Sequence, residues 1–209
     1  MVAAFDFDGT LSRHDSLVPF LRRLCGDLQV LRVGLRNAHL IGGAAAGLVS
    51  RDRVKEAVLL PLLGGLPLAA AEAEAERYAV HLVDHELRPV VRERLEWHRE
   101  RGDEVVIVSA SPELYLGHVG GALGCAAVLA TRLESAGDRL TGRLLGRNVR
   151  GPEKTARLDA WLGGDTPELW AYGDSAGDRE LLARADRAFR RRGDGLRPAP
   201  AGGAQAGRR

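Results

Sequence analysis

The strongest constraint on the fold is a run of β-branched residues, EVVIVS at 104–109. Such a run is typical of a strand that is buried on both faces of a parallel sheet. Helical patterns and shorter apolar runs alternate after it, which predicts a sheet with helices on both faces. The expected helices cover 113–123, 154–162 and 179–185, and the expected strands cover 126–130, 169–172 and 188–190. The predicted fold class is therefore α/β, with a Rossmann-like parallel sheet core.

The first half of the chain contributes one strand and then helices. Residues 2–7 form a short apolar run that ends in a glycine turn, as expected of a buried strand. Helical spacing dominates 14–85, so we expect an all-helical cap to be inserted after this strand. A further helix is expected over 89–101 and a β-hairpin over 132–147. The predicted domains are an α/β core (1–13 and 86–192), the helical cap (14–85) and a disordered basic tail (193–209).

Positive charge gathers at the end of the chain. Residues 187–209 carry seven arginines and one aspartate, whereas the whole chain of 209 residues has a formal net charge of +2, so the remainder is acidic. The tail itself, 193–209, has no aromatic residue on which a base could stack. We therefore expect no nucleic-acid partner.

Composition also bounds the compartment. The two cysteines, Cys25 and Cys125, cannot build a disulfide framework, and no export signal is visible at the acidic N-terminus, so a cytoplasmic protein is expected. The apolar segment 28–49 is interrupted by Arg32 and Arg36, which argues against a transmembrane span. We expect it to pack as a cap helix; peripheral contact with a lipid surface is the alternative.

Polar side chains follow the predicted strands. Asp6 and Asp8 end the first strand, Ser109 and Ala110 end the second, and Asp174 ends a third. Carboxyl ends of parallel strands meet at one edge of a sheet, so these residues should lie close together. Carboxylates so close repel one another unless a cation intervenes, and an all-oxygen site suits Mg²⁺.

A lysine at this edge stands out from the composition. The chain has 28 arginines and two lysines, Lys55 and Lys154. Lys154 opens a helix directly after Gly151-Pro152, and a compact ammonium there can neutralise phosphoryl oxygens. The sequence therefore predicts a phosphate site beside the metal site.

Four segments in this order resemble the motifs of the haloacid dehalogenase-like (HAD) hydrolase superfamily. They are FDFDGTL at 5–11, VVIVSAS at 105–111, Lys154, and GDSAGD at 173–178. The helical insertion between the first and second motifs is similar to the phosphoserine phosphatase-like branch, subfamily IB. The resemblance covers about residues 2–185 and implies a Mg²⁺-dependent phosphatase that acts on a small-molecule phosphate monoester.

The resemblance implies a role for each matching residue. Asp6 would be the nucleophile that forms an aspartyl-phosphate, and Asp8 the general acid and base. Ser109, the neighbouring Ala110 and Lys154 would hold the phosphoryl oxygens.

It also implies a metal site. Asp6, the backbone carbonyl of Asp8 and Asp174 would bind Mg²⁺. Asp178 would orient Lys154 or a metal-bound water from behind them.

The sequence departs from phosphoserine phosphatases where those enzymes bind the amino acid. Their glutamate after the first motif is replaced by Asp15, which is the expected substrate-binding acid here, and Gly177 stands where they usually have asparagine. The cap offers Arg51, Arg53 and Lys55, but none falls clearly at the position of their arginine. These departures argue against phosphoserine as the substrate.

Other functions share some of these residues. A phosphoryl-transferase or a lipid-phosphate phosphatase could use all of them. A serine esterase could use Ser175 in GDSAG, but all six histidines precede it, against the order of that fold. A non-catalytic phospho-acceptor module of the receiver type is the remaining alternative, and the insertion of about seventy residues after the first strand argues against it.

Overall fold

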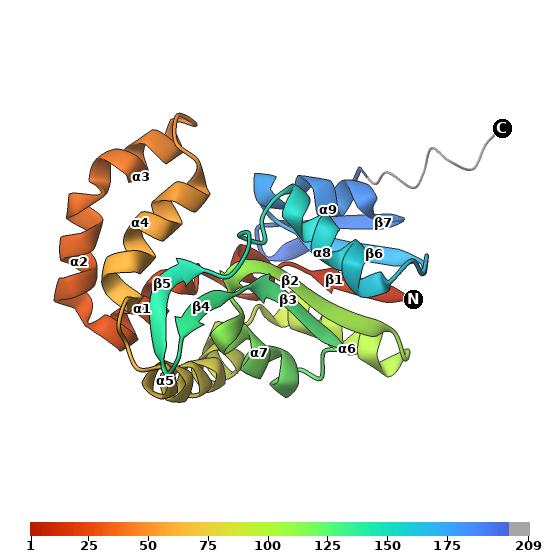
Figure 1. The fold of residues 1–209 in the computed structure, drawn as a ribbon. Coiled ribbons are helices and arrows are strands. Elements are labelled where there is room, and N and C mark those ends of the chain that lie inside the picture. Colours follow the sequence, from red (N-terminus) through yellow and green to blue (C-terminus); the bar gives the residue numbers. More distant parts are fainter. Residues whose placement is uncertain (201–209) are drawn as a thin grey trace.

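The structure is a computed structural model that describes residues 1–200, and a six-stranded sheet lies at its centre (Figure 1). The order across the sheet is β3-β2-β1-β6-β7-β8. The strands are β1 (Val2–Phe5), β2 (Glu104–Pro112), β3 (Ala127–Thr131), β6 (Leu169–Gly173), β7 (Arg187–Arg192) and β8 (Gly195–Ala199). All neighbours are parallel except β7 and β8. The predicted α/β class with a largely parallel sheet is confirmed.

The central strand β1 is buried on both faces, and its alternation assigns each face to its own helices. Ala3 and Phe5 belong to the core formed with α6 (Pro89–Glu100) and α7 (Glu113–Ala122). Val2 and Ala4 belong to the core formed with α8 (Pro152–Leu162) and α9 (Arg179–Arg184). Because no face of β1 meets water, every residue of the strand is apolar, as a central parallel strand requires.

Five helices lie between β1 and α6. They are α1 (Leu17–Cys25), α2 (Asp27–Arg36), α3 (Ala38–Ala45), α4 (Arg51–Leu63) and α5 (Leu68–His81). In Figure 1, α2, α3 and α4 project to one side of the sheet, whereas α5 lies below it beside α7. An apolar core that includes Leu21, Leu59 and Leu63 joins α1 and α4. Helix α3 has no buried residue, and α5 also packs on the main core through Ala75 and Tyr78.

A short hairpin joins the core to the cap. It consists of β4 (Leu133–Ala136) and β5 (Arg139–Leu144), which pair antiparallel, as the sequence predicted. Leu140 exchanges backbone hydrogen bonds with the α4–α5 connection: its amide donates to Leu66 O (2.9 Å), and its carbonyl accepts from Gly65 N (2.8 Å). The hairpin therefore fixes one end of α4 to the core.

The apolar segment 28–49 does not form one helix. It divides into α2 and α3 at Asn37, whose backbone leaves the helical conformation (φ −101°, ψ 11°) and whose side chain also donates to Val33 O (2.9 Å). Within residues 1–200, no helix has the combination of length and apolar character that crossing a bilayer requires.

The expectation of a disordered tail from residue 193 is wrong for its first residues. Gly193 adopts φ +58°, which lets the chain reverse, and β8 then pairs antiparallel with β7. Leu196 packs against the main core. The composition did not reveal this hairpin, because β8 has no apolar pattern of its own and pairs with an arginine-rich strand. The rest of the predicted tail, 201–209, lies outside the described residues.

Candidate active site

The carboxyl ends of β1, β2 and β6 meet at a cavity of about 410 Å³. Its walls come from segments that are far apart in the sequence, because the parallel strands bring their ends to one edge. Of the predicted site residues, those that line the cavity are Asp6, Asp8, Asp15, Ala110, Lys154, Asp174 and Asp178. Asp6 follows β1 directly, Lys154 lies in the first turn of α8, and Asp174 follows β6.

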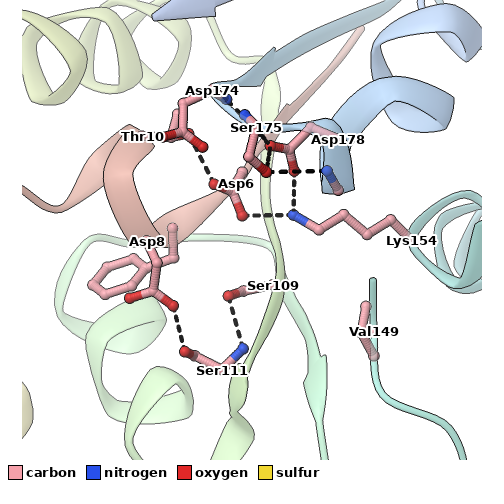
Figure 2. A network of polar contacts seen from close by, with 12 residues as sticks. Asp6, Asp8, Thr10, Ser109, Ser111, Val149, Lys154, Asp174, Ser175 and Asp178 are labelled. Atoms are coloured by element: carbon pink, nitrogen blue, oxygen red, sulfur yellow. Dashed lines mark hydrogen bonds and ion pairs between the residues drawn. The ribbon is translucent and has the colours of Figure 1, made fainter. Parts of the chain in front are cut away.

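Lys154 forms the centre of a buried ion-pair network (Figure 2). Its Nζ lies 2.5 Å from Asp6 Oδ1 and 2.6 Å from Asp178 Oδ1. The other oxygen of Asp6 accepts from Thr10 Oγ1 at 2.8 Å. Both carboxylate oxygens of Asp6 therefore have a fixed donor, and the carboxylate has one defined orientation.

The three groups of this network influence one another's protonation. Burial raises the pKa of Asp6, and the Lys154 ammonium opposes that rise. Burial would lower the pKa of Lys154, but the two facing carboxylates raise it above its ordinary value, so the ammonium stays charged. Burial also acts to raise the pKa of Asp178, yet the ammonium and the donors of Ser175 hold it below its ordinary value. A charged lysine between two carboxylates results.

Asp8 lies apart from this network, although it is only two residues from Asp6. Its Oδ1 accepts from the amide and hydroxyl of Ser16 (2.8 and 2.6 Å), and its Oδ2 accepts from the Ser111 hydroxyl. In Figure 2 its carboxylate points toward Ser111, whereas Asp6 points toward Lys154. Burial raises the pKa of Asp8 above its ordinary value. Such a carboxyl holds a proton at higher pH than an ordinary aspartate does, which suits a general acid.

Asp6, Asp174 and Asp178 form the carboxylate cluster of the site. Among residues 1–200, these three offer oxygens that all lie within 4.8 Å of one another. The Asp8 carboxylate is not part of this cluster. That Asp8 offers its backbone carbonyl to a metal stays a prediction. Asp8 lines the same cavity, but its side chain is directed toward Ser111 and not toward the cluster.

The residues present fit a hard divalent cation. The donor set consists only of oxygens, as Mg²⁺ prefers. Gly9 adopts φ +76°, and a Cβ at this position would collide with Asp174 Oδ2, so the missing side chain leaves room for the carboxylate. Asp174 Oδ2 lies 3.1 Å from Arg191 Nη2, which balances part of the negative charge.

Three predicted substrate-binding residues lie in different settings. Ser109 is 1% exposed, and its Oγ accepts from the amide of Ser111 (3.1 Å). Ala110 lines the cavity, and its carbonyl accepts from the Lys55 ammonium. Asp15 is exposed at the cavity rim, but its Oδ1 accepts from the amides of Leu17 and Val18 at the start of α1 (3.1 and 3.3 Å). The carboxylate of Asp15 is thus engaged in stabilising a helix terminus.

Lys55 is a site residue to which the sequence analysis gave no role. Its Nζ reaches from α4 to the core, where it donates to Ala110 O and to Asn148 Oδ1 (3.0 Å). Burial lowers the pKa of Lys55 to about 8, against the raising effect of nearby carboxylates such as Asp8. A signal was available, because both lysines of this arginine-rich chain lie at the site.

Other contributing residues were also missed. Thr10 and Ser111 stand inside the quoted motifs, and Ser16 directly precedes α1, so their positions carried a weak signal. Arg150 and Arg191 line the cavity, but nothing in the sequence distinguishes them from the other arginines.

Ser175 has a structural role in its turn. Its hydroxyl donates to Asp178 Oδ2 (2.9 Å) and accepts from the Gly177 amide (3.1 Å). Asp178 in return accepts from the Ser175 amide at 2.9 Å, so the two residues form a capping box. This arrangement explains the serine without an esterase reaction.

The sequence of the chain matches one family model and several known proteins over most of its length. The model of the haloacid dehalogenase-like hydrolase family matches residues 3–183. The protein CicA of Caulobacter vibrioides is 35% identical over 189 residues, which cover 89% of this chain and 83% of CicA. A histidinol-phosphatase of Neisseria meningitidis serogroup C is 27% identical over 190 residues, which cover 87% of this chain and 85% of the relative.

Solved structures share the fold. A protein of unknown function from Bordetella pertussis Tohama I superposes with a TM-score of 0.76 at 26% identity, over 90% of this chain and 87% of that one. A substrate-bound phosphoserine phosphatase complex superposes with a TM-score of 0.66 over 90% of this chain and 84% of that one. At 21% identity, the second likeness shows a common fold.

Proposed function

Because the chain belongs to the haloacid dehalogenase-like hydrolase family, as its four motifs predicted, we propose that it hydrolyses a small-molecule phosphate monoester with Mg²⁺ as its cofactor. The observation that carries the proposal is the contact of Lys154 with both Asp6 and Asp178 beside Asp174. Burying an ammonium between carboxylates opposes folding, because removing charge from water is unfavourable. The presence of such a group at this edge of the sheet therefore favours a functional role, and Lys154 lies where we expect a phosphoryl group and a cation to bind.

In the proposed first step, Asp6 attacks the phosphorus atom. An oxygen–phosphorus bond forms to Asp6, the bond from phosphorus to the ester oxygen breaks, and Asp8 gives its proton to the leaving alcohol. The raised pKa of Asp8 supports this role, because its carboxyl retains a proton at higher pH than an ordinary aspartate does. Ser16 and Ser111 hold that carboxyl in place.

In the second step, water hydrolyses the aspartyl-phosphate. Asp8, now ionised, takes a proton from the attacking water, and the bond between Asp6 and phosphorus breaks. The products are the free alcohol and inorganic phosphate, and both aspartates return to their starting states.

The remaining residues stabilise charge. Lys154 holds phosphoryl oxygens, with Ala110 and the neighbouring Ser109 on the other side of the site, and Asp178 positions the ammonium. Asp6, Asp174 and the Asp8 carbonyl would hold Mg²⁺, which when bound shields the negative charge of the phosphate from that of Asp6.

Phosphate release from a panel of phosphomonoesters tests the proposal. Turnover that requires Mg²⁺, stops with EDTA and is lost in Asp6→Asn supports it. Turnover that is unaffected by EDTA, or that persists at the full rate in Asp6→Asn, contradicts it. Ser175→Ala serves as a control that should retain most of the activity, whereas an esterase would lose all of it.

A further inference from the structure

A second cavity, of about 460 Å³, lies between the cap helices and the core. Its apolar walls come from three helices of the cap, including Leu17 and Leu21 of α1, Ile41 of α3, and Val54 and Val58 of α4. A cavity of this size, with apolar walls and a few polar groups, is typical of sites for small organic ligands.

The second cavity adjoins the catalytic one. Arg51, Ala110 and Arg150 line both cavities, so a molecule whose phosphate lies beside Lys154 can extend past them into the cap. Gly177 helps to place this junction. A Cβ at Gly177 would lie 3.2 Å from Arg150 Nε, so the glycine gives the arginine its space.

The charge at the junction disfavours an amino-acid substrate. Arg51, Lys55 and Arg150 are all cations at this point, so the ammonium of phosphoserine would meet positive charge. The carboxylates that act on Lys55 are Asp8, Asp15 and Asp52, and each already has hydrogen-bond donors. Asp8 binds Ser16 and Ser111, Asp15 binds the amides at the start of α1, and Asp52 Oδ1 accepts from Asn148 Nδ2 at 2.7 Å.

Helix α3 provides an independent reason to expect an apolar occupant. Its sequence, AHLIGGAA, is apolar apart from one histidine, yet none of its residues is buried. Ile41, on its cavity side, is 44% exposed, and so is Val18 opposite on α1. An apolar group in the cavity would remove these side chains from water, which is favourable in proportion to the area covered.

We propose that the substrate is the phosphate monoester of an apolar alcohol, whose chain or ring occupies the cavity between α1, α3 and α4. This inference rests on the proposed phosphatase function, because that function places the phosphate at the mouth of the cavity. The leaving group of this substrate is an alkyl or aryl alcohol without an ammonium group. Its phosphate ester reaches the enzyme either from solution or from a membrane, as a lipid phosphate that carries an acyl chain.

A series of substrates of increasing chain length tests the inference. Each buried methylene strengthens binding about fourfold. Hexyl phosphate has four more methylenes than ethyl phosphate, so burial of only two of them should raise kcat/KM about tenfold or more, with O-phosphoserine below both. A flat series, or a preference for O-phosphoserine, would overturn the inference and leave the phosphatase function standing.

Variants of exposed residues separate the cavity from the rest of the cap. Ile41→Gln should lower kcat/KM for hexyl phosphate about fourfold or more and leave that for ethyl phosphate unchanged, since the added amide opposes burial of the chain. Leu35→Gln on α2 is the matched control, because Leu35 is 67% exposed and does not line the cavity. Equal effects of both variants on hexyl phosphate would count against the cavity.

Two further measurements complete the test: the affinity for each substrate, and turnover of a soluble compared with a membrane-bound substrate. Calorimetry with hexyl and ethyl phosphate on the Asp6→Asn protein measures the same preference without turnover, so a wrong mechanism and a wrong leaving group can be told apart. Equal affinities would overturn the inference. Turnover of hexyl phosphate in solution, compared with a monoacylglycerol phosphate in phosphatidylcholine vesicles, distinguishes the free alcohol from the lipid, and either preference supports an apolar leaving group.

Discussion

Lys154 Nζ lies 2.5 Å from Asp6 Oδ1, although 148 positions separate the two residues in the chain. The contact exists because β1 is central and the turn before α8 comes to the carboxyl end of the same sheet. One buried lysine thereby links the end of the first strand to the turn after β6, where Asp178 lies. The stability of the core and the chemistry of the site depend on the same ion pairs.

Replacing Lys154 with methionine should lower both the stability of the protein and its activity. Methionine keeps most of the length of the side chain but leaves Asp6 and Asp178 buried without their cation, which costs roughly 3–5 kcal/mol in comparable cases. Urea unfolding measures the loss of stability, and phosphate release should fall at least about a hundredfold. Arg157→Met on the same helix is the control, because Arg157 forms a surface pair with Glu153 that contributes less than about 1 kcal/mol. Similar losses of stability in the two variants would argue against the central role of Lys154.

Asp8→Asn should separate proton transfer from nucleophilic attack. Asparagine can occupy the place between Ser16 and Ser111 but cannot supply a proton. With an alkyl phosphate, we expect kcat to fall about a hundredfold or more, because the alkoxide is a poor leaving group. With p-nitrophenyl phosphate, whose leaving group needs no proton, the first step should be far less affected in rapid-quench experiments. An equal loss on both substrates in that step would exclude Asp8 as the general acid.

Gly9→Ala should weaken the response to Mg²⁺. The new methyl group would collide with Asp174 Oδ2 and displace a carboxylate that we expect to bind the ion. The Mg²⁺ concentration for half-maximal activity should rise about tenfold, in line with the loss of one well-placed interaction. Gly137→Ala is the matched control, since Gly137 has a similar φ of +60° but open space around it, so it shares the backbone strain alone. An unchanged Mg²⁺ requirement in Gly9→Ala would contradict the assignment of Asp174.

The contacts of Lys55 should govern closure of the cap. Lys55 joins α4 to Ala110 and Asn148, so Lys55→Met should loosen the cap at the mouth of the site. A loosened cap admits water and positions substrate poorly, and we expect kcat/KM to fall about tenfold while the free energy of unfolding changes little. Small-angle scattering with and without substrate would detect the change in closure. Wild-type kcat/KM in this variant would show that the contact has no part in the reaction.

His98 should make stability depend on pH. It is fully buried, with Nε2 2.9 Å from the Tyr172 hydroxyl and Nδ1 2.8 Å from Asp103. Burial lowers the pKa of His98 below its ordinary value of 6.5, even though Asp103 acts to raise it. The unfolded chain therefore binds a proton more readily than the folded chain, and the stability due to neutral His98 is lost as pH falls through 6.5.

Comparison with a non-titrating variant isolates this effect from that of other groups. The difference in free energy of unfolding between the wild type and His98→Gln should become smaller from pH 7 to pH 5, as measured by urea denaturation. A difference that stays constant or grows over this range would contradict the predicted direction of the pKa shift.

The sequence predicted the sheet well, because the evidence for it is local. The β-branched run in β2 and the apolar run of β1 are patterns within a few residues, and parallel topology then brings their ends to one edge. This reasoning was sufficient to place Asp6, Lys154 and Asp174 around one cavity. It did not anticipate β8, whose order depends on pairing with β7 rather than on its own composition.

The sequence did not predict in which direction individual side chains point. The sequence placed both Asp6 and Asp8 at the end of the first strand, but β1 ends at Phe5, and Asp8 lies in a turn where strand alternation does not apply. Its orientation is set by Ser16 and Ser111, one of which is 103 residues away. Tertiary packing determines such long-range partners and the arginines that line the cavity, and the spacing of residues in the sequence does not reveal it.

Trapping the phosphorylated enzyme tests the central claim most directly. The wild-type protein is mixed with Mg²⁺ and hexyl phosphate, quenched in acid and digested, and the peptides are examined by mass spectrometry. The account predicts the mass of one added phosphoryl group on Asp6. With p-nitrophenyl phosphate, whose leaving group needs no proton, it also predicts a larger trapped fraction in Asp8→Asn, where hydrolysis of the intermediate is slowed. Turnover of the substrate with no phosphoryl group on Asp6, or with the group on another residue, would contradict it.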